Sequence, residues 1–214
     1  MSWVILGAGN LIGDIIDAVE TREEKIYGVV YNEPLSEFIS NKLNSKKILM
    51  QDLESYLKGF GVVTPSSTHH IFGFLATNKQ AFLGSIASYQ LSFSNLLHPR
   101  ASIPTSVRMG VGNYFGPLSV VGTDAQIGNF NYFNRAVSIG HDTQIGNLNR
   151  FGPAATVCGR CKIGDRSYIG ANATVIDGIL IHDDVTIGAG GVATKHLDSP
   201  GTYVGIPARL MPKR

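Results

Sequence analysis

A histidine and an aspartate stand side by side in the stretch SIGHDTQIG, at His141 and Asp142. An imidazole can accept a proton near neutral pH, and a neighbouring carboxylate can fix its tautomer and raise its basicity. The pair interrupts a rhythm of Ile-Gly pairs, Ile139-Gly140 and Ile145-Gly146. An outward histidine is often only a solvated surface residue, but the adjacent carboxylate makes His141 the first candidate for a general base.

A glycine pattern near the N-terminus could bind phosphate. Gly7, Gly9 and Gly13 lie between an apolar run and a segment with helical spacing, where backbone N–H groups and the helix dipole favour an anion. The same glycines could simply form a tight strand-to-helix turn. The segment is long enough for about one βαβαβ half, which favours a nucleoside diphosphate with something attached. Asn32 and Glu33, at the end of the next expected strand, are placed to contact its ribose or base.

Cys158 and Cys161 form a C-x-x-C pattern, which could be a redox pair. In that chemistry the first thiol lies at a helix N-terminus, which lowers its pKa. Here both cysteines lie inside a repeat of short strands, and Cys161 takes a position that Ala or Ser takes elsewhere. The pattern therefore indicates a structural role.

The other histidines do not converge on a metal. We expect His69 and His70 in a loop before a strand, and His98 in a structural role at a domain junction. A zinc site of the carbonic anhydrase type would need three histidines, and only His141 and His182 lie in the repeat. We therefore expect no metal site.

The element that must position His141 is a repeat with a period of six. Glycine often follows the apolar residue, and a small residue often stands four positions after it. Fifteen apolar residues keep this spacing without an insertion: Ile103, Met109, Phe115, Val121, Ile127, Phe133, Ile139, Ile145, Phe151, Val157, Ile163, Ile169, Val175, Ile181 and Ile187.

A period of six is typical of a parallel β-helix, in which each hexad is a short strand and a corner. We expect the large residue to fill the interior, the small one to fit near the corner, and glycine to supply the backbone angles of the turn. Three hexads close one triangular coil, so the repeat predicts about five coils, roughly 25 Å of stacked strands.

The first 97 residues alternate between strand and helix patterns, which predicts a small Rossmann-like parallel α/β domain. The boundary with the β-helix, residues 98–214, is expected near His98-Pro99. The expected strands are 3–6, 25–33, 47–50, 60–63 and 71–76, and the expected helices are 10–20, 51–59 and 78–91.

Composition excludes several classes of protein. The 214 residues carry a net charge of only +2 and contain no Lys/Arg run, so nucleic acid is not an expected partner. The N-terminus lacks the features of a signal peptide, and no apolar stretch approaches the roughly 20 residues of a membrane helix. Two cysteines do not make a disulfide framework. We expect a soluble cytoplasmic protein.

Four stretches together carry a resemblance to a known family. GAGNLIG (7–13), NLLHPRASI (95–103), SIGHDTQIGN (138–147) and IGAGGVATK (187–195), the last followed by YVGIPARLM, resemble the sialic acid O-acyltransferase group of left-handed β-helix acyltransferases. That group includes N-acetyltransferases of nucleotide-linked amino sugars. The resemblance covers nearly the whole chain and implies a left-handed coil, a homotrimer, acetyl-CoA between neighbouring coils and a nucleotide-sugar in the N-terminal domain.

The resemblance also implies roles for individual residues. His141 matches the general base, Asp142 the acid that orients it, and Gly159 a backbone N–H donor to the thioester oxygen. Coenzyme contacts are implied at Ala171, Ala189 and Lys195, and nucleotide contacts at Gly7, Gly9, Asn10, Leu11, Asn32 and Glu33.

Two positions depart from the family pattern. Arg150 stands where relatives usually carry a second histidine near the coenzyme, which puts details of coenzyme or acceptor binding in doubt. Relatives tend to have Asp at the end of the second strand, where this chain has Asn32-Glu33, so the nucleotide base is left open.

These observations favour an acetyl-CoA-dependent enzyme that N-acetylates a nucleotide-linked amino sugar, a precursor of bacterial surface glycans. No Ser or Cys nucleophile is needed, because the amine attacks the thioester directly. Alternatives are O-acetylation of a sialic-acid-like sugar and a non-catalytic β-helix scaffold. A nicotinamide-dependent oxidoreductase would rest on the glycine pattern alone and would leave the whole β-helix unexplained.

Overall fold

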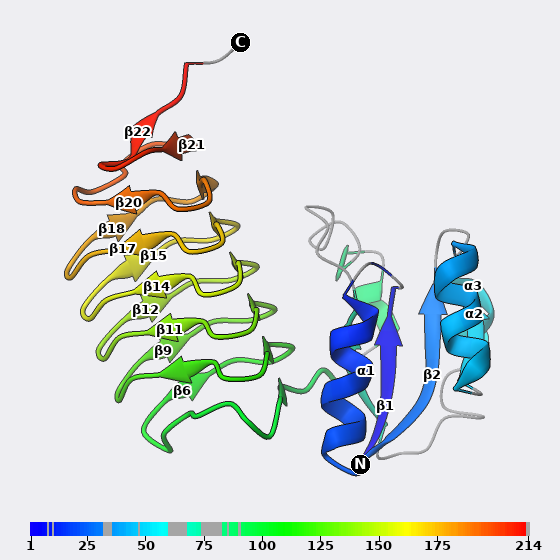
Figure 1. Cartoon of the computed structure of the whole chain (residues 1–214). Helices are drawn as coiled ribbons and strands as arrows, with labels where there is room; N and C mark the ends of the chain where they lie inside the picture. Colours follow the sequence, from blue (N-terminus) through cyan, green and yellow to red (C-terminus); the bar gives the residue numbers. More distant parts are fainter. Residues whose placement is uncertain are drawn as a thin grey trace. The chain divides into compact units, whose positions relative to one another are not determined.

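The computed structural model describes residues 1–7, 9, 11–31, 36–46, 48–59, 68–73, 83–84, 86–89 and 91–212. The chain divides into two compact units, Met1–Leu96 and Leu97–Arg214 (Figure 1). Among the helices of these described ranges, none is long and apolar enough to cross a bilayer.

The N-terminal unit contains a sheet of four parallel strands in the order β3-β2-β1-β4. Strands and helices alternate along the chain, which confirms the predicted α/β organisation. The elements are β1 Ser2–Leu6, α1 Ile12–Thr21, β2 Lys25–Tyr31, α2 Glu37–Ser45, β3 Leu49–Asp52, α3 Leu53–Gly59, β4 Thr68–Phe72 and the short 3-10 helix η1 Ala87–Tyr89.

The first helix of this unit follows the predicted spacing, and the second was not predicted. Leu11, Ile15 and Val19 are all buried beside the sheet, because residues four apart lie on one face of a helix. Helix α2 has a weak apolar pattern, but its first turn is capped by Ser36, whose Oγ accepts a hydrogen bond from the backbone N–H of Ile39 at 3.3 Å. The cap is the sequence signal that could have located this helix.

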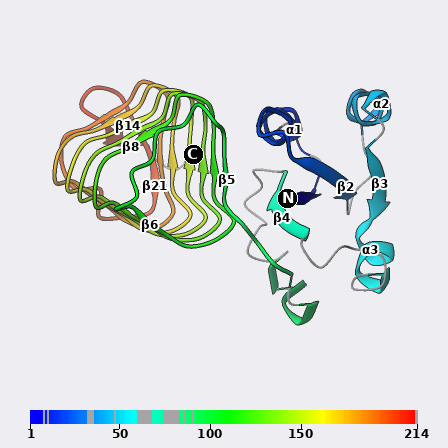
Figure 2. The same cartoon turned by 90° about the horizontal axis from the view of Figure 1, so that it is seen from below.

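The C-terminal unit is a coil with three flat faces, each a sheet of stacked parallel strands (Figures 1 and 2). The first face contains β5 Leu96–Leu97, β7 Tyr114–Phe115, β10 Tyr132–Phe133, β13 Arg150–Phe151, β16 Tyr168–Ile169, β19 Val185–Ile187 and β21 Gly201–Val204, with β22 Arg209–Leu210 antiparallel at its end. The second face contains β8 Val120–Val121, β11 Ser138–Ile139, β14 Thr156–Val157, β17 Thr174–Val175 and β20 Val192–Ala193. The third contains β6 Arg108–Met109, β9 Gln126–Ile127, β12 Gln144–Ile145, β15 Lys162–Ile163 and β18 Leu180–Ile181.

Strands pair with strands eighteen residues away, as Ser138 pairs with Thr156, so three hexads make one turn as predicted. The hexad residues point inward; Phe115, Phe133 and Phe151 stack along the axis with ring centroids 4.3 and 4.6 Å apart. The coil makes about six turns rather than the five that were predicted. It begins with β5, before the first counted hexad, and continues past Ile187 through β20. The left-handed sense of the coil stays a prediction.

The glycines of the hexads have a different role from the one predicted. The left-handed backbone conformation recurs every six residues from 112 to 190, but it falls three positions after the apolar residue, as at Asp142, whose φ is 56°. The glycine that directly follows the apolar residue does not have a positive φ. A Cβ at Gly152 would instead lie 2.6 Å from the backbone nitrogen of Ala171 in the next turn. Glycine is required there because neighbouring turns approach closely.

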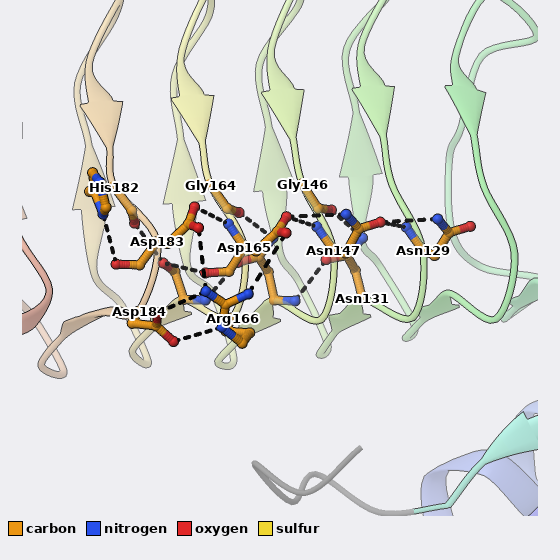
Figure 3. A network of polar contacts seen from close by, with 12 residues as sticks. Asn129, Asn131, Gly146, Asn147, Gly164, Asp165, Arg166, His182, Asp183 and Asp184 are labelled. Atoms are coloured by element: carbon orange, nitrogen blue, oxygen red, sulfur yellow. Dashed lines mark hydrogen bonds and ion pairs between the residues drawn. The ribbon is translucent and has the colours of Figure 1, made fainter. Parts of the chain in front are cut away.

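The corner between the third and first faces is held by side chains that bond from turn to turn (Figure 3). Asn147 Oδ1 accepts from the backbone N–H and the amide of Asn129 at 2.8 and 3.0 Å, and Asp165 does the same for Asn147 at 2.7 and 3.1 Å. A second, buried ladder runs inside it, where Asn149 Oδ1 accepts from Ser167 N–H at 2.7 Å. These ladders pair corner N–H groups that the sheets leave unpaired.

Candidate active site

The corner between the second and third faces, called here the 2–3 corner, carries the histidine-aspartate pair. His141 and Asp142 lie between β11 and β12, and the left-handed conformation of Asp142 turns the chain from one face to the next. The backbone is held on both sides: Asp142 N–H donates to Thr123 O at 3.0 Å, and Arg160 N–H donates to His141 O at 2.9 Å. The backbone of the pair is therefore rigid, while its side chains face solvent.

The two side chains are hydrogen-bonded to each other. His141 Nδ1 lies 2.7 Å from Asp142 Oδ2, and the side chains are 49% and 58% exposed. A carboxylate can only accept, so Nδ1 carries the hydrogen and Nε2 of the neutral ring carries the free lone pair. This is the arrangement that a general base with an orienting acid requires.

Gly159 lies in the same corner, one turn further along the coil. A Cβ at this position would lie 2.8 Å from His141 Nε2 and 3.0 Å from its Cε1. The absence of a side chain therefore leaves room for the imidazole. Within the described residues, the backbone N–H of Gly159 has no hydrogen-bond partner and is available to an oxygen of a ligand.

Asp177 occupies this corner one turn beyond Gly159, and the sequence analysis did not select it. The same Cβ at Gly159 would lie 3.1 Å from Asp177 Oδ1. Arg160 Nη2 forms a long ion pair with Asp177 at 3.4 Å, with side chains 61% and 57% exposed. The signal that could have found this residue is its spacing, because His141, Gly159 and Asp177 are separated by one 18-residue turn each.

The cysteine pair of this corner is structural. Both cysteines are free, and burial raises the pKa of each thiol, with the charge of Asp177 adding to the effect at Cys158. Cys161 Sγ donates to Ile176 O at 3.1 Å, just as Thr143 Oγ1 in the preceding turn donates to the Cys158 carbonyl at 3.1 Å. Cys161 therefore bonds the next corner as a hydroxyl does, and a buried thiol of raised pKa is poorly suited to redox exchange.

The prediction that His69 and His70 lie in a loop was wrong, because both belong to β4. His70 is fully buried in that strand, which a polar pair would not suggest. Its Nδ1 donates to the Ser92 carbonyl at 3.0 Å and its Nε2 accepts from the Tyr56 hydroxyl at 2.7 Å. Burial lowers the pKa of His70 and raises that of Tyr56, so both are held neutral.

His98 is buried in the coil unit, where its Nδ1 accepts from Arg100 N–H at 3.1 Å, in keeping with its expected structural role. Among the described residues, no three His, Cys, Asp or Glu side chains are grouped as metal ligands.

The residues expected to contact the coenzyme are spread over the coil. Ala171 and Ala189 lie in successive turns of the corner between the first and second faces, and Lys195 lies in the 2–3 corner. Arg150 lies in β13 on the first face, on a different side of the triangle from His141. Its guanidinium lies over the ring of Tyr168 at 4.7 Å from the centroid, and its buried Nε has no hydrogen-bond partner in the described part of the chain.

A shallow groove of about 720 Å³ follows the third face, along the column Arg108, Gln126, Gln144 and Lys162. It is not lined by His141, Asp142 or Gly159. The groove is therefore separate from the cluster in the 2–3 corner.

The glycine loop of the N-terminal unit is a tight turn in which two amides are already bonded. Gly7 has a φ of 81°, its N–H donates to Val30 O at 2.6 Å, and Gly9 N–H donates to Gly73 O at 3.1 Å. Leu11 is the N-cap of α1 and has no side-chain cap. Of the predicted nucleotide contacts, Asn10, Asn32 and Glu33 lie outside the described residues.

Comparison with known families shows the hexapeptide repeat. The family described as "Bacterial transferase hexapeptide (six repeats)" matches residues 142–177 and 160–194. A comparison with curated proteins finds no match to the chain.

Solved structures with the same fold cover both units of the chain. A histidine-to-asparagine mutant of perosamine N-acetyltransferase from Caulobacter crescentus, in complex with CoA and GDP-perosamine, has a TM-score of 0.88 at 23% identity, covering 100% of this chain and 98% of that one. The acetyltransferase domain of PglB from Neisseria gonorrhoeae, in complex with acetyl coenzyme A, has 0.82 at 18% identity, covering 98% of each chain. WeeI from Acinetobacter baumannii has 0.82 at 18% identity, covering 99% and 100%.

Proposed function

We propose that the protein is an acyltransferase that moves the acetyl group of acetyl-CoA to the amino group of a nucleotide-linked amino sugar. The observation that carries the proposal is the 2–3 corner, where His141 Nε2 faces solvent beside the unpaired N–H of Gly159. The fold is shared with proteins that bind CoA and GDP-perosamine, and a sugar amine is the acceptor that such a base would serve.

The cluster supplies two of the requirements of acyl transfer. His141 Nε2 accepts a proton from the acceptor nitrogen, and the Nδ1 bond to Asp142 stabilises the imidazolium that forms. The N–H of Gly159 donates to the thioester oxygen as negative charge develops there. The N–C bond forms and the C–S bond breaks, so the products are an amide and CoA thiol, without a covalent enzyme intermediate.

The coenzyme site is proposed to lie between two copies of the chain in a homotrimer. Arg150 and His141 belong to different sides of the coil, so one copy cannot present both to the same ligand. Arg150, whose buried Nε lacks a partner, would meet the coenzyme beside His141 of a neighbouring copy, with Ala171, Ala189 and Lys195 as further contacts. Light scattering tests this proposal, and a fully active monomer would contradict it.

The N-terminal unit, residues 1–97, is proposed to hold the nucleotide part of the acceptor. Since Gly7 and Gly9 donate to the protein's own backbone, the donors left for phosphate are at Leu11 and the start of α1. Gly9→Val should raise the acceptor KM and leave that of acetyl-CoA nearly unchanged. Equal losses in a folded variant would argue against a dedicated nucleotide pocket. The product would be a precursor of a bacterial surface glycan, made in the cytoplasm.

The test of the proposed function is a screen for CoA thiol release. Wild-type protein is incubated with acetyl-CoA and a panel of nucleotide-linked amino sugars that includes GDP-perosamine, with hydroxyl analogues and a reaction without acceptor as controls. The proposal predicts release only with amines and its loss in His141→Ala. Release with hydroxyl acceptors alone would favour O-acetylation, and no release with any acceptor would favour a non-catalytic scaffold.

A further inference from the structure

Two side chains from different turns converge over Gly159 in the 2–3 corner. His141 comes from the turn before Gly159 and Asp177 from the turn after it. A Cβ on Gly159 would lie 2.8 Å from Nε2 of the histidine and 3.1 Å from Oδ1 of the aspartate. The space over Gly159 is therefore bordered by an imidazole nitrogen on one side and a carboxylate on the other.

Both groups that border this space are hydrogen-bond acceptors. The Nδ1 hydrogen of His141 is taken by Asp142, which leaves the lone pair on Nε2. Asp177 carries a negative charge, and Arg160, its ion-pair partner, is 3.4 Å away and largely exposed. Such a pair contributes little and can yield to a ligand. The charge of Asp177 is felt within the corner, since it helps raise the pKa of Cys158.

We propose that Asp177 makes this site select a protonated amine as the acceptor over a hydroxyl. The inference rests on the proposed function and deepens it, because it assigns the choice between N- and O-acetylation to one residue. A sugar ammonium has three hydrogens, of which one can bond to His141 Nε2 and a second to Asp177 Oδ1. A hydroxyl has one hydrogen and no charge, so it can satisfy only one of the two acceptors.

The proposed binding mode is consistent with the proton balance of the reaction. One N–H bond of the bound ammonium breaks, and His141 Nε2 takes that proton and later releases it to solvent. The freed lone pair forms the N–C bond, the C–S bond breaks, and the departing thiolate takes a second proton from the nitrogen. Asp177 neither gains nor loses a proton; it contacts the acceptor and holds the nitrogen over Gly159.

The test compares Asp177→Asn with Asp124→Asn, a matched control in the same corner but on the far side of His141 from Asp177. With GDP-perosamine as the acceptor, Asp177→Asn should raise KM about 10-fold, the loss expected for a hydrogen bond to a charged group at an exposed site, and change kcat less. Affinity for the analogue with a hydroxyl in place of the amine should be unchanged. Asp177→Glu should recover part of the loss, and Asp124→Asn should behave as wild type.

An unchanged amine KM in folded Asp177→Asn would overturn the inference, and so would an equal loss of affinity for the hydroxyl analogue. A measurement independent of turnover separates this from failure of the proposed function. Calorimetry on the CoA-bound wild-type protein compares GDP-perosamine with its hydroxyl analogue. Tighter binding of the amine, lost in Asp177→Asn, would support the inference even if no CoA is released. Equal binding, or no binding of either, would overturn it.

Discussion

Replacement of His141 by alanine is the most direct perturbation of the 2–3 corner. Loss of a general base should lower kcat by about 10²- to 10⁴-fold, or roughly 3–5 kcal/mol in the activation barrier. The stability of the coil should change by less than about 0.5 kcal/mol, since 49% of the side chain is exposed and its one hydrogen bond is to an exposed neighbour. The variant therefore separates chemistry from folding.

Asp142→Asn should cost far less than the loss of the histidine. The His141–Asp142 bond is 2.7 Å long but lies between side chains 49% and 58% exposed, where solvent screens it. Such a pair is worth about 0.2–1 kcal/mol, which corresponds to roughly a 1.5- to 5-fold change in kcat. At this exposed position the new amide can rotate its oxygen toward Nδ1, so the histidine tautomer is not inverted as at a buried site. Asparagine also tolerates the φ of 56° at this position.

The assay is steady-state CoA release at saturating acetyl-CoA, with thermal melts of the same proteins. His182→Ala is the matched control, because His182 is an exposed histidine of the same coil in another corner. A folded His141→Ala enzyme with nearly wild-type kcat would refute the assignment of the base. Equal losses in the His141 and Asp142 variants would refute the ranking derived from their exposure.

Three further outcomes follow from the packing. Gly159→Ala should lower kcat because its Cβ must displace the His141 ring, while melts stay close to wild type, since the obstructing atoms are ends of exposed side chains; an active variant would show that the ring tolerates displacement. Asn149→Ala should lower the free energy of unfolding by about 2–4 kcal/mol, because buried N–H and C=O groups lose partners, and Asn147→Ala by about 1 kcal/mol; urea titrations would show any reversed ranking. Because burial lowers the pKa of His70, the unfolded chain binds a proton that the folded unit does not, so the N-terminal unit should lose stability as the pH falls below about 6.5. Melts of wild type and His70→Gln at several pH values test this, and equal slopes would contradict it.

The architecture could be predicted where it follows from local periodicity. A hexad places one large side chain inward at each strand whatever its neighbours are, so the apolar steps from Ile103 to Ile187 predicted the faces and the 18-residue turn. The start of α1 was predicted for a similar reason, since Leu11, Ile15 and Val19 mark one helix face. The ends of the coil were misjudged, because β5 precedes the first hexad.

The glycines show where local reasoning failed. Glycine after the apolar residue suggested a requirement for unusual backbone angles, yet the left-handed position falls two residues later and is often Asp, Ala or Arg. The constraint on Gly140 is a neighbouring turn, where a Cβ would meet the backbone of Cys158 and Gly159. A requirement imposed by a segment eighteen residues away leaves no mark on the local pattern.

The sequence by itself determined the repeat, the outward position of His141 and the acid beside it, because strand alternation and adjacency in the chain are local properties. Only the tertiary structure decided that the imidazole leans over Gly159, that the N–H of Gly159 is unpaired and that Asp177 meets the same space. Those relations depend on how turns stack and which rotamers the side chains adopt once stacked. The stacking distance is common to every turn of the coil, so the chemistry of this corner comes from which residues share it.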